Sequence, residues 1–266
     1  GVGCERGTSA EEIHELVSAT LAEHGLAPEA IACFASLDLK EDEAGINALG
    51  DVRFFSHTEL NAESHRVIRP SQIVLAEVGT PSVAEASALA AAGPDSVLIV
   101  PKTKSKRATC AIASSPDPIL THRGRSRGVL AVIGLGPGDP SLRAPEATAK
   151  LSAATDWVGY DLYLDLAMDA HSRQVLHRFP LGGEEDRVKH AIALAKSGRR
   201  VALICSGDAG IYAMAALVYE MLDFDRCRIG VEVIPGISAF QVAAARTGGL
   251  IGHDFCAISL SDLLTP

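Results

Sequence analysis

The first hydrophobic pattern along the chain has the period of an α-helix. Apolar residues recur at helical spacing at Ile13, Leu16, Val17 and Leu21. Ser9 and Glu12, at the start of this pattern, have the spacing of a capping box, and Gly25 follows its end. We therefore predict an amphipathic helix that begins after Ser9 and ends near Gly25.

Further along, short apolar runs alternate with helical patterns. In the first half we predict a helix over 82–92 and strands at 52–55, 96–100 and 108–113. In the second half the predicted strands are 129–134, 156–160, 201–205, 231–234 and 255–259. The helical patterns between them lie near 144–154, 184–197, 210–222 and 238–247. Such alternation predicts the α/β class, with two domains that each contain a mostly parallel sheet flanked by helices.

Residues 115–127 separate the two halves. They contain two prolines, several small polar residues and three arginines, a composition typical of a linker. The arginines are expected to be solvated, and steering of an acidic ligand is the alternative. We therefore predict domains over 1–114 and 128–266, joined by a linker over 115–127.

The net charge of the chain narrows the range of possible functions. The 266 residues carry a net charge of −9, which argues against non-specific nucleic-acid binding because that needs a basic face. An anionic small substrate stays open, since a cleft can be locally basic. No apolar stretch has the length of a membrane span, and we expect no signal peptide.

The six cysteines form no Cys-x-x-Cys pair, so we expect no metal site. Buried free thiols of a cytoplasmic protein are the favoured interpretation. The chain starts at Gly1 without methionine and stops after an apolar run. From this we expect a piece of a longer chain.

Three glycine-containing loops each follow a predicted strand and precede a helical pattern. They are residues 134–140, 206–212 and 235–239. In a parallel sheet they share one edge, the edge at which ligands bind. Together they could line one pocket with backbone amides, a carboxylate and an aromatic ring. For one such loop alone, a tight strand-to-helix turn is an equal alternative, and neither the Rossmann spacing nor the Lys-Ser/Thr of a phosphate loop is present.

In this order and spacing the three loops resemble those of the tetrapyrrole methylase family. Segments 159–165, 184–187 and 252–266 narrow the resemblance to the precorrin-3B C17-methyltransferases and their relatives with a cobalt-containing substrate. The resemblance covers 128–266, about the first half of such an enzyme. It implies a partial tetrapyrrole methylase fold, the first of two lobes that hold the cofactor between them, and a homodimer.

The resemblance also implies a cofactor and its contacts. S-adenosylmethionine would lie against Pro137, Gly207, Asp208, Ile211, Tyr212, Ser238 and Ala239. For Asp208 the alternative is a helix N-cap, which is compatible with cofactor binding. For Tyr212 simple packing is an equal alternative.

The implied reaction is methylation of a tetrapyrrole, precorrin-3B or its cobalt form, at C17 with ring contraction. The substrate carbon is the nucleophile, so the enzyme mainly aligns the two reactants and excludes water. Ring contraction needs proton transfer, for which Asp139 and His253 are the candidate catalytic residues. A helix-capping role is the alternative for Asp139, and a packed or capping role is the alternative for His253.

The first domain has a resemblance of its own. Segments 1–9, 38–43, 82–86 and 101–111 resemble the C-terminal domain of cobalt-precorrin-5A hydrolase. A site of paired charges for lactone opening, or for holding a corrinoid without catalysis, could use Lys40, Glu43, Glu85 and Lys102. The alternative for Lys40 and Glu43 is a solvated helix start. Cys4 is a weak candidate nucleophile, because nothing in the sequence places a histidine base beside it.

Overall fold

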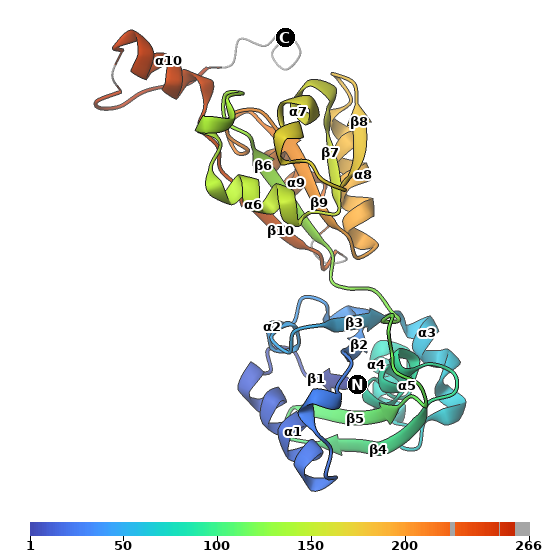
Figure 1. Cartoon of the computed structure of the whole chain (residues 1–266). Coiled ribbons are helices and arrows are strands. Elements are labelled where there is room, and N and C mark those ends of the chain that lie inside the picture. The colour runs from blue at the N-terminus through green and yellow to red at the C-terminus, as the bar shows by residue number, and fades with distance from the viewer. Residues whose placement is uncertain (224–226, 250, 259–266) are drawn as a thin grey trace. The chain divides into compact units, whose positions relative to one another are not determined.

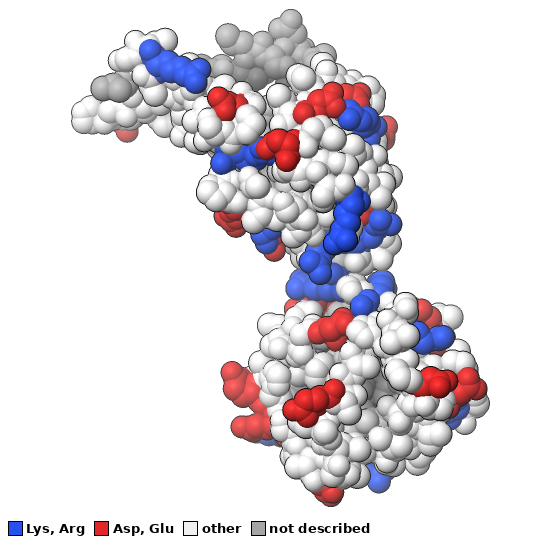
Figure 2. Space-filling model, in the orientation of Figure 1, with Lys and Arg blue, Asp and Glu red and all other residues white. Residues whose placement is uncertain are grey.

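A computed structural model describes residues 1–223, 227–249 and 251–258. The chain divides into two compact units, Gly1–Arg127 and Gly128–Pro266, which we describe separately (Figure 1). No helix among the described residues has the length and hydropathy needed to span a bilayer. On the face that Figure 2 shows, acidic and basic side chains are interspersed on each unit.

The first unit is a mixed α/β fold. Its strands are β1 (Val2–Cys4), β2 (Phe34–Leu37), β3 (Val52–Phe55), β4 (Val97–Lys104) and β5 (Ala108–Ser114). Its α-helices are α1 (Ala10–Glu23), α2 (Ala44–Asn47), α3 (His57–Ala62), α4 (Gln72–Val78) and α5 (Ala84–Ala92). The predicted α1 is confirmed, including the cap, where the Ser9 side chain accepts a hydrogen bond from the amide of Glu12.

The strand directions of the first unit differ from the expected parallel sheet. Strands β1, β5 and β4 form an antiparallel sheet in that order, whereas β2 and β3 form a separate parallel pair. The reason is the short connection between β4 and β5: a hairpin forces antiparallel pairing, whereas parallel neighbours need a long crossover. Helix α5 is buried along nearly its whole length, and its small alanines let it pack closely against these strands.

Part of the predicted linker belongs to the first unit. The backbone of Arg125 exchanges two hydrogen bonds with that of Phe54, and its guanidinium pairs with Glu41. The Nε of Arg123 donates to the carbonyl of Ala90. The prediction that the linker arginines are only solvated is therefore wrong for Arg125, which is partly buried and paired, whereas Arg123 stays exposed although it donates to one carbonyl.

The second unit contains one parallel sheet of five strands, in the order β10–β6–β9–β7–β8. The strands are β6 (Val129–Gly134), β7 (Asp156–Tyr160), β8 (Val175–Phe179), β9 (Arg200–Cys205) and β10 (Gly230–Ile234). The α-helices are α6 (Pro145–Ala153), α7 (Asp161–Leu166), α8 (Glu184–Lys196), α9 (Met214–Met221) and α10 (Ala239–Thr247). This arrangement confirms the predicted parallel α/β sheet.

Successive residues of the central strands point to opposite faces of the sheet, and each face is covered by an apolar layer. Leu130, Val132 and Leu203 pack with helices α8 and α9 on one face. Ile133 and Trp157 pack with α6 and α7 on the other face. Because both faces are covered, these strands are apolar at almost every position, and such continuous apolar runs are what made them recognisable in the sequence.

Two second-unit predictions need correction. Residues 255–258 of the predicted strand 255–259 form no strand, and residue 259 lies outside the described residues. A strand requires a partner for its backbone groups, and none of the described strands pairs with this segment. Helix α9 begins at Met214 instead of residue 210, because Tyr212 has a positive φ of 48°, which helical backbone cannot adopt.

Candidate functional site

The three glycine loops meet at the carboxyl edge of the second-unit sheet. They follow β6, β9 and β10, which are neighbours in the sheet and run in the same direction (Figure 1). The first two loops are joined directly: the amide of Gly136 donates to the carbonyl of Gly207 at 3.1 Å, and that of Gly207 donates back at 2.8 Å. The expected common edge is therefore present.

Close backbone approach explains why two of these positions are glycine. A Cβ on Gly236 would lie 2.1 Å from the carbonyl oxygen of Gly207, and a Cβ on Gly134 would lie 2.5 Å from the same atom. Gly207 itself has a φ of +63°, a conformation that glycine adopts without strain. The sequence thus allows three backbones to come together where side chains would keep them apart.

Asp208 joins the second loop to the third. Its Oδ1 accepts a hydrogen bond from the amide of Gly210 at 2.7 Å, and its Oδ2 accepts one from the amide of Gly236 at 3.1 Å. The helix-cap alternative for Asp208 is wrong, because the cap position of α9 is Ala213. The carboxylate instead fixes the loop edge and leaves negative charge there.

Ile211 and Tyr212 present apolar surface at this edge. Their exposed fractions are 44% and 65%, so packing into the core does not account for Tyr212. The phenol of Tyr212 donates a hydrogen bond to the carbonyl of Ala257 at 2.8 Å. Its left-handed backbone costs roughly 1–2 kcal/mol for a residue with a Cβ, a strain that often accompanies functional positions.

The other expected cofactor contacts also lie on these loops. Pro137 follows Gly136 in the first loop and is partly buried. Ser238 is the cap residue of α10, and its amide donates to the side-chain oxygen of Gln241 at 2.8 Å. Ala239 is the first residue of that helix. Their positions are compatible with the predicted contacts, whose roles stay predictions.

Asp139 has the geometry of a capping residue. Its Oδ1 accepts hydrogen bonds from the amide and the hydroxyl of Ser141, at 2.9 and 2.8 Å. These two bonds lower the pKa of the Asp139 carboxyl below its ordinary value. An exposed carboxylate that stays ionised is a poor general acid at neutral pH, so proton transfer by Asp139 stays a prediction that these contacts do not favour.

His253 lies in the exposed segment 251–258. Two contacts hold this segment near the loop edge: the Tyr212–Ala257 hydrogen bond and a ring contact between Phe240 and Phe255, whose centroids are 5.8 Å apart. Among the described residues His253 has no hydrogen-bond partner. Within the described part of the chain it is exposed and caps no helix, and its catalytic role stays a prediction.

Two buried arginines next to the loops were missed by sequence reasoning. Arg143 closes the turn after the first loop and pairs with Asp169. Arg187 pairs with Glu184 in the first turn of α8. Burial raises the pKa of Cys205, the last residue of β9, to about 12, and the charge of Arg187 opposes this shift in small part. Arginine is usually exposed, so only the three-dimensional structure reveals these charges beneath the loops.

A chain of polar side chains under α8 was also missed. His177 Nε2 lies 3.0 Å from Asp156 Oδ1, and His190 Nε2 lies 2.8 Å from His177 Nδ1. Burial tends to raise the pKa of Asp156, but hydrogen bonds from Thr155, His177 and Arg199 together lower it below its ordinary value. Strand β8, which carries His177, was not predicted, so no sequence signal joined these residues.

The hydrogen-bonded side chains of Asp156, His177 and His190 make the stability of the second unit depend on pH. Burial, and then the charge of His177, lower the pKa of His190 from its ordinary 6.5. The unfolded state therefore takes up this proton more readily than the folded state. The free energy of unfolding is expected to fall as pH drops through about 6.5, and His190→Gln should flatten this dependence.

Urea titrations at several pH values, followed by the fluorescence of the single tryptophan Trp157, would measure this effect. A glutamine at position 190 can still donate a hydrogen bond to His177 but cannot take up a proton near neutral pH. The His190→Gln variant therefore separates the titration of His190 from the loss of its hydrogen bond. Equal pH slopes in both proteins would contradict the assignment to His190.

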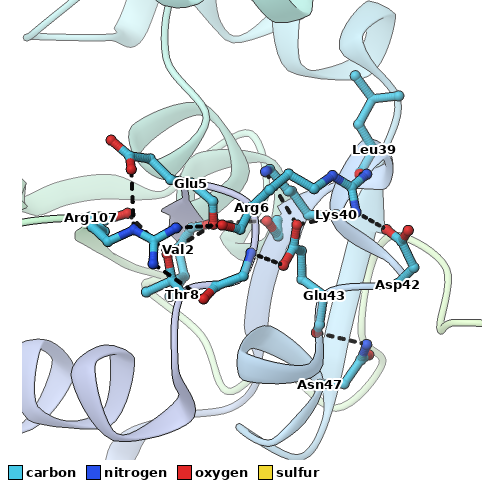
Figure 3. Close-up of polar contacts among 12 residues, drawn as sticks. Val2, Glu5, Arg6, Thr8, Leu39, Lys40, Asp42, Glu43, Asn47 and Arg107 are labelled. Carbon is cyan, nitrogen blue, oxygen red and sulfur yellow. Dashed lines mark hydrogen bonds and ion pairs between the residues drawn. The ribbon is translucent and has the colours of Figure 1, made fainter.

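In the first unit, the four charged residues predicted to share one site form two separate pairs. Lys40 Nζ lies 3.6 Å from Glu43 Oε1 (Figure 3). Glu85 is fully buried and accepts hydrogen bonds from the amides of Ile68, Arg69 and Lys102. No hydrogen bond or ion pair among the described residues links the two pairs. The solvated-helix-start alternative is also wrong for Glu43, which is 5% exposed.

Comparison with known proteins agrees with both resemblances. Residues 1–113 match the family described as Cobalamin synthesis G C-terminus, and residues 129–266 match the Tetrapyrrole (Corrin/Porphyrin) Methylases. A protein named "Probable cobalt-factor III C(17)-methyltransferase" from Salmonella typhimurium is 44% identical over 138 residues, which are 52% of this chain and 57% of that protein.

Two further relatives match the same half. The "Cobalamin biosynthesis protein CobIJ" of Mycobacterium tuberculosis is 42% identical over 54% of this chain and 28% of its own length. The solved structure titled "Crystal structure of the methyltransferase CobJ" is 43% identical over 52% of this chain and 59% of its own, with a TM-score of 0.48. The chain thus spans less than two thirds of the length of each of these three proteins.

Proposed function

The chain belongs to the tetrapyrrole (corrin/porphyrin) methylases, and from this premise we propose that it serves S-adenosylmethionine-dependent methylation of a corrin precursor at C17, with ring contraction, in cobalamin biosynthesis. The observation that carries the proposal is the junction of three glycine loops at one sheet edge. The names of the matching relatives support the choice of C17 and of precorrin-3B or its cobalt form.

The loop edge fits the proposed cofactor. S-adenosylmethionine supplies a methyl group on a positively charged sulfur. Asp208 offers a carboxylate held by two amides, which is complementary to a cation. Ile211 and Tyr212 offer exposed apolar surface that would bury part of the ligand and exclude water.

The residues of the three glycine loops would act by holding the two reactants in position. The attacking atom is a carbon of the substrate, so the reaction needs no nucleophile from the protein. The crossed backbones of the loops are rigid because no side chain separates them, and a rigid edge can hold the two reactants in line. Arg143 and Arg187 lie buried near this edge, and each is already paired with a carboxylate, so their charges serve the fold and not the substrate.

The sharpest test of this site is Asp208→Asn, because asparagine keeps the size of the side chain and removes its charge. We expect the affinity for S-adenosylhomocysteine, whose sulfur is uncharged but which keeps the ammonium group of the amino-acid part, to fall about tenfold or more, the effect of a lost charge-assisted contact with that ammonium. Asp165→Asn, which removes an exposed carboxylate of α7 paired with Arg178, is the matched control and should leave the affinity unchanged.

Calorimetric titration of both variants measures the difference. Equal affinities in the unchanged protein and the Asp208 variant would remove Asp208 from the site. A urea midpoint that stays the same in the Asp208 variant would show that lost binding does not reflect lost folding.

The alternative function, lactone opening or corrinoid holding by the first unit, rests on fewer groups than the sequence suggests. Glu85 is occupied by three backbone amides, and the ammonium of Lys102 donates to the carbonyl of Arg69 at 2.7 Å. Both residues therefore hold the fold together. Glu43 is 5% exposed and is likewise held by the amide of Gly7 and by Arg6.

A further inference from the structure

The first unit contains a cavity beside the start of β1. Its volume is about 450 Å³, and Gly1 and Val2 form part of its wall. Strand β1 lies between β5, with which it pairs, and β2, whose Ser36 donates a hydrogen bond to the carbonyl of Val2 at 2.8 Å (Figure 1). The cavity reaches along both neighbours, at 110–114 of β5 and at 34–35 of β2. It therefore lies in line with β1, between the same two strands.

Strand β5 offers backbone hydrogen-bonding groups to this cavity. The nitrogen of Gly1 donates to the carbonyl of Ala111 at 2.8 Å, and the amide of Ala111 donates to the carbonyl of Gly1 at 3.0 Å. Residues two apart on a strand point their backbone groups to the same side, and the register shifts between β4 and β5 place their extra residues in β4, so this alternation holds along β5. The N–H and carbonyl of Ala113 therefore face the side of β1, where in the described part of the chain no strand reaches this residue. Ala113 thus presents one donor and one acceptor at the cavity wall.

The two side walls of the cavity favour side chains of different size. Val2 and Cys110 are cross-strand partners that pack toward α1, and the wall on this side is aliphatic, formed by Val17, Leu21, Leu26, Ile31 and Ile112. Gly1 instead faces α5, where a Cβ would lie 1.9 Å from the carbonyl oxygen of Ala84. On that side the cavity is lined by small side chains, those of Ala88, Ala91 and Ala92. An extended segment in the cavity would direct larger side chains toward α1 and smaller ones toward α5.

The lining disfavours both charged and compact ligands. Asp117 is the only charged residue of the cavity lining in the described part of the chain, and it is exposed. Burying a charge of the ligand without a partner would cost free energy. A compact apolar ligand would leave the N–H and carbonyl of Ala113 without partners, which is also unfavourable. A strand of apolar peptide avoids both costs, because its backbone pairs with β5 while its side chains contact the two walls.

We propose that this cavity binds an apolar peptide in extended conformation, which pairs antiparallel with β5 in line with β1. The side chains of the peptide alternate, with a branched one opposite Ile112 and a small one opposite Ala113, as the two walls require. The site lies in the first unit, so it does not depend on methyl transfer by the second unit.

A tethered peptide gives the sharpest test, because a short tether raises its effective concentration at the cavity. Two extended proteins would carry four residues in front of Gly1, Ala-Val-Ala-Val in one and Val-Ala-Val-Ala in the other. The two tetrapeptides have the same composition, so non-specific apolar contacts are matched. Only the first places valine opposite Ile112 and alanine opposite Ala113.

Hydrogen–deuterium exchange followed by nuclear magnetic resonance would measure the amide of Ala113. The amide of Phe54, which donates to the carbonyl of Arg125 in the same unit, corrects for a general change in stability. We expect the exchange rate of Ala113 relative to Phe54 to fall about tenfold with Ala-Val-Ala-Val, the effect of one backbone hydrogen bond. With Val-Ala-Val-Ala it should stay within about twofold of the rate in the unextended protein, because valine overpacks the wall of α5.

An unchanged relative rate at Ala113 with Ala-Val-Ala-Val would overturn the proposal, since no strand would then pair with β5. Equal slowing by the two tetrapeptides would overturn it as well, since the two walls would then not select the side chains of the peptide.

Discussion

A Glu85→Gln variant is expected to unfold with a free energy about 3 kcal/mol below that of the unchanged protein. Both oxygens of Glu85 are occupied, Oε2 by the amides of Ile68 and Arg69 and Oε1 by that of Lys102, at 2.8–2.9 Å. Glutamine offers one oxygen and one NH₂ group. At least one buried backbone N–H would then face another donor instead of an acceptor.

The effect is large because Glu85 connects three parts of the first unit. It lies in α5, and its partners come from the 67–69 turn and from β4. The matched control is Glu77→Gln in α4, an exposed carboxylate, for which we expect a change within about 0.5 kcal/mol.

Urea unfolding followed by far-UV circular dichroism would measure both variants. Fluorescence of Trp157 reports on the second unit, and its midpoint should stay the same in each. A Glu85 variant as stable as the Glu77 variant would show that the three hydrogen bonds contribute little.

Gly236→Ala is expected to destabilise the second unit by about 3 kcal/mol and to abolish ligand binding at the loop edge. The added methyl group would lie 2.1 Å from the carbonyl oxygen of Gly207 and 2.8 Å from that of Gly134. Both neighbours are backbone atoms of the adjoining loops, so relief requires the three loops to separate.

Gly230→Ala, at the first residue of the strand β10 that precedes the third loop, is the matched control. Its methyl group would make an ordinary contact of 3.4 Å with Val129, and we expect a change within about 1 kcal/mol. Trp157 fluorescence in urea distinguishes the two variants. If Gly236→Ala were as stable as Gly230→Ala, the crossing of the loops would be looser than the distances indicate.

The sequence predicts the features that depend on local pattern. Helix α1 was recognisable from its period and its Ser9 cap, and β6 and β9 from apolar runs that follow from burial on both faces. Strand β8 was missed because it is an edge strand whose residues include the polar His177 and Arg178. Edge strands lack the continuous apolar signal of central ones.

Features that depend on pairing between distant segments were not predictable. The antiparallel direction of β4 and β5 and the absence of a strand at 255–258 both follow from which neighbour is available. The common edge of the glycine loops was predicted, because parallel strands share their carboxyl ends. The hydrogen bond from the amide of Gly236 to Asp208 was not predicted, because it depends on the order of the strands in the sheet.

The central claim is that the three loops bind the methyl donor, and a nuclear magnetic resonance titration tests it most directly. S-adenosylhomocysteine would be added to the ¹⁵N-labelled chain while the amide signals of Gly136, Gly207 and Gly236 are followed. We predict saturable shifts at these amides and unchanged signals in residues 1–114. Unchanged loop signals in the folded chain, at a large excess of ligand, would contradict the account.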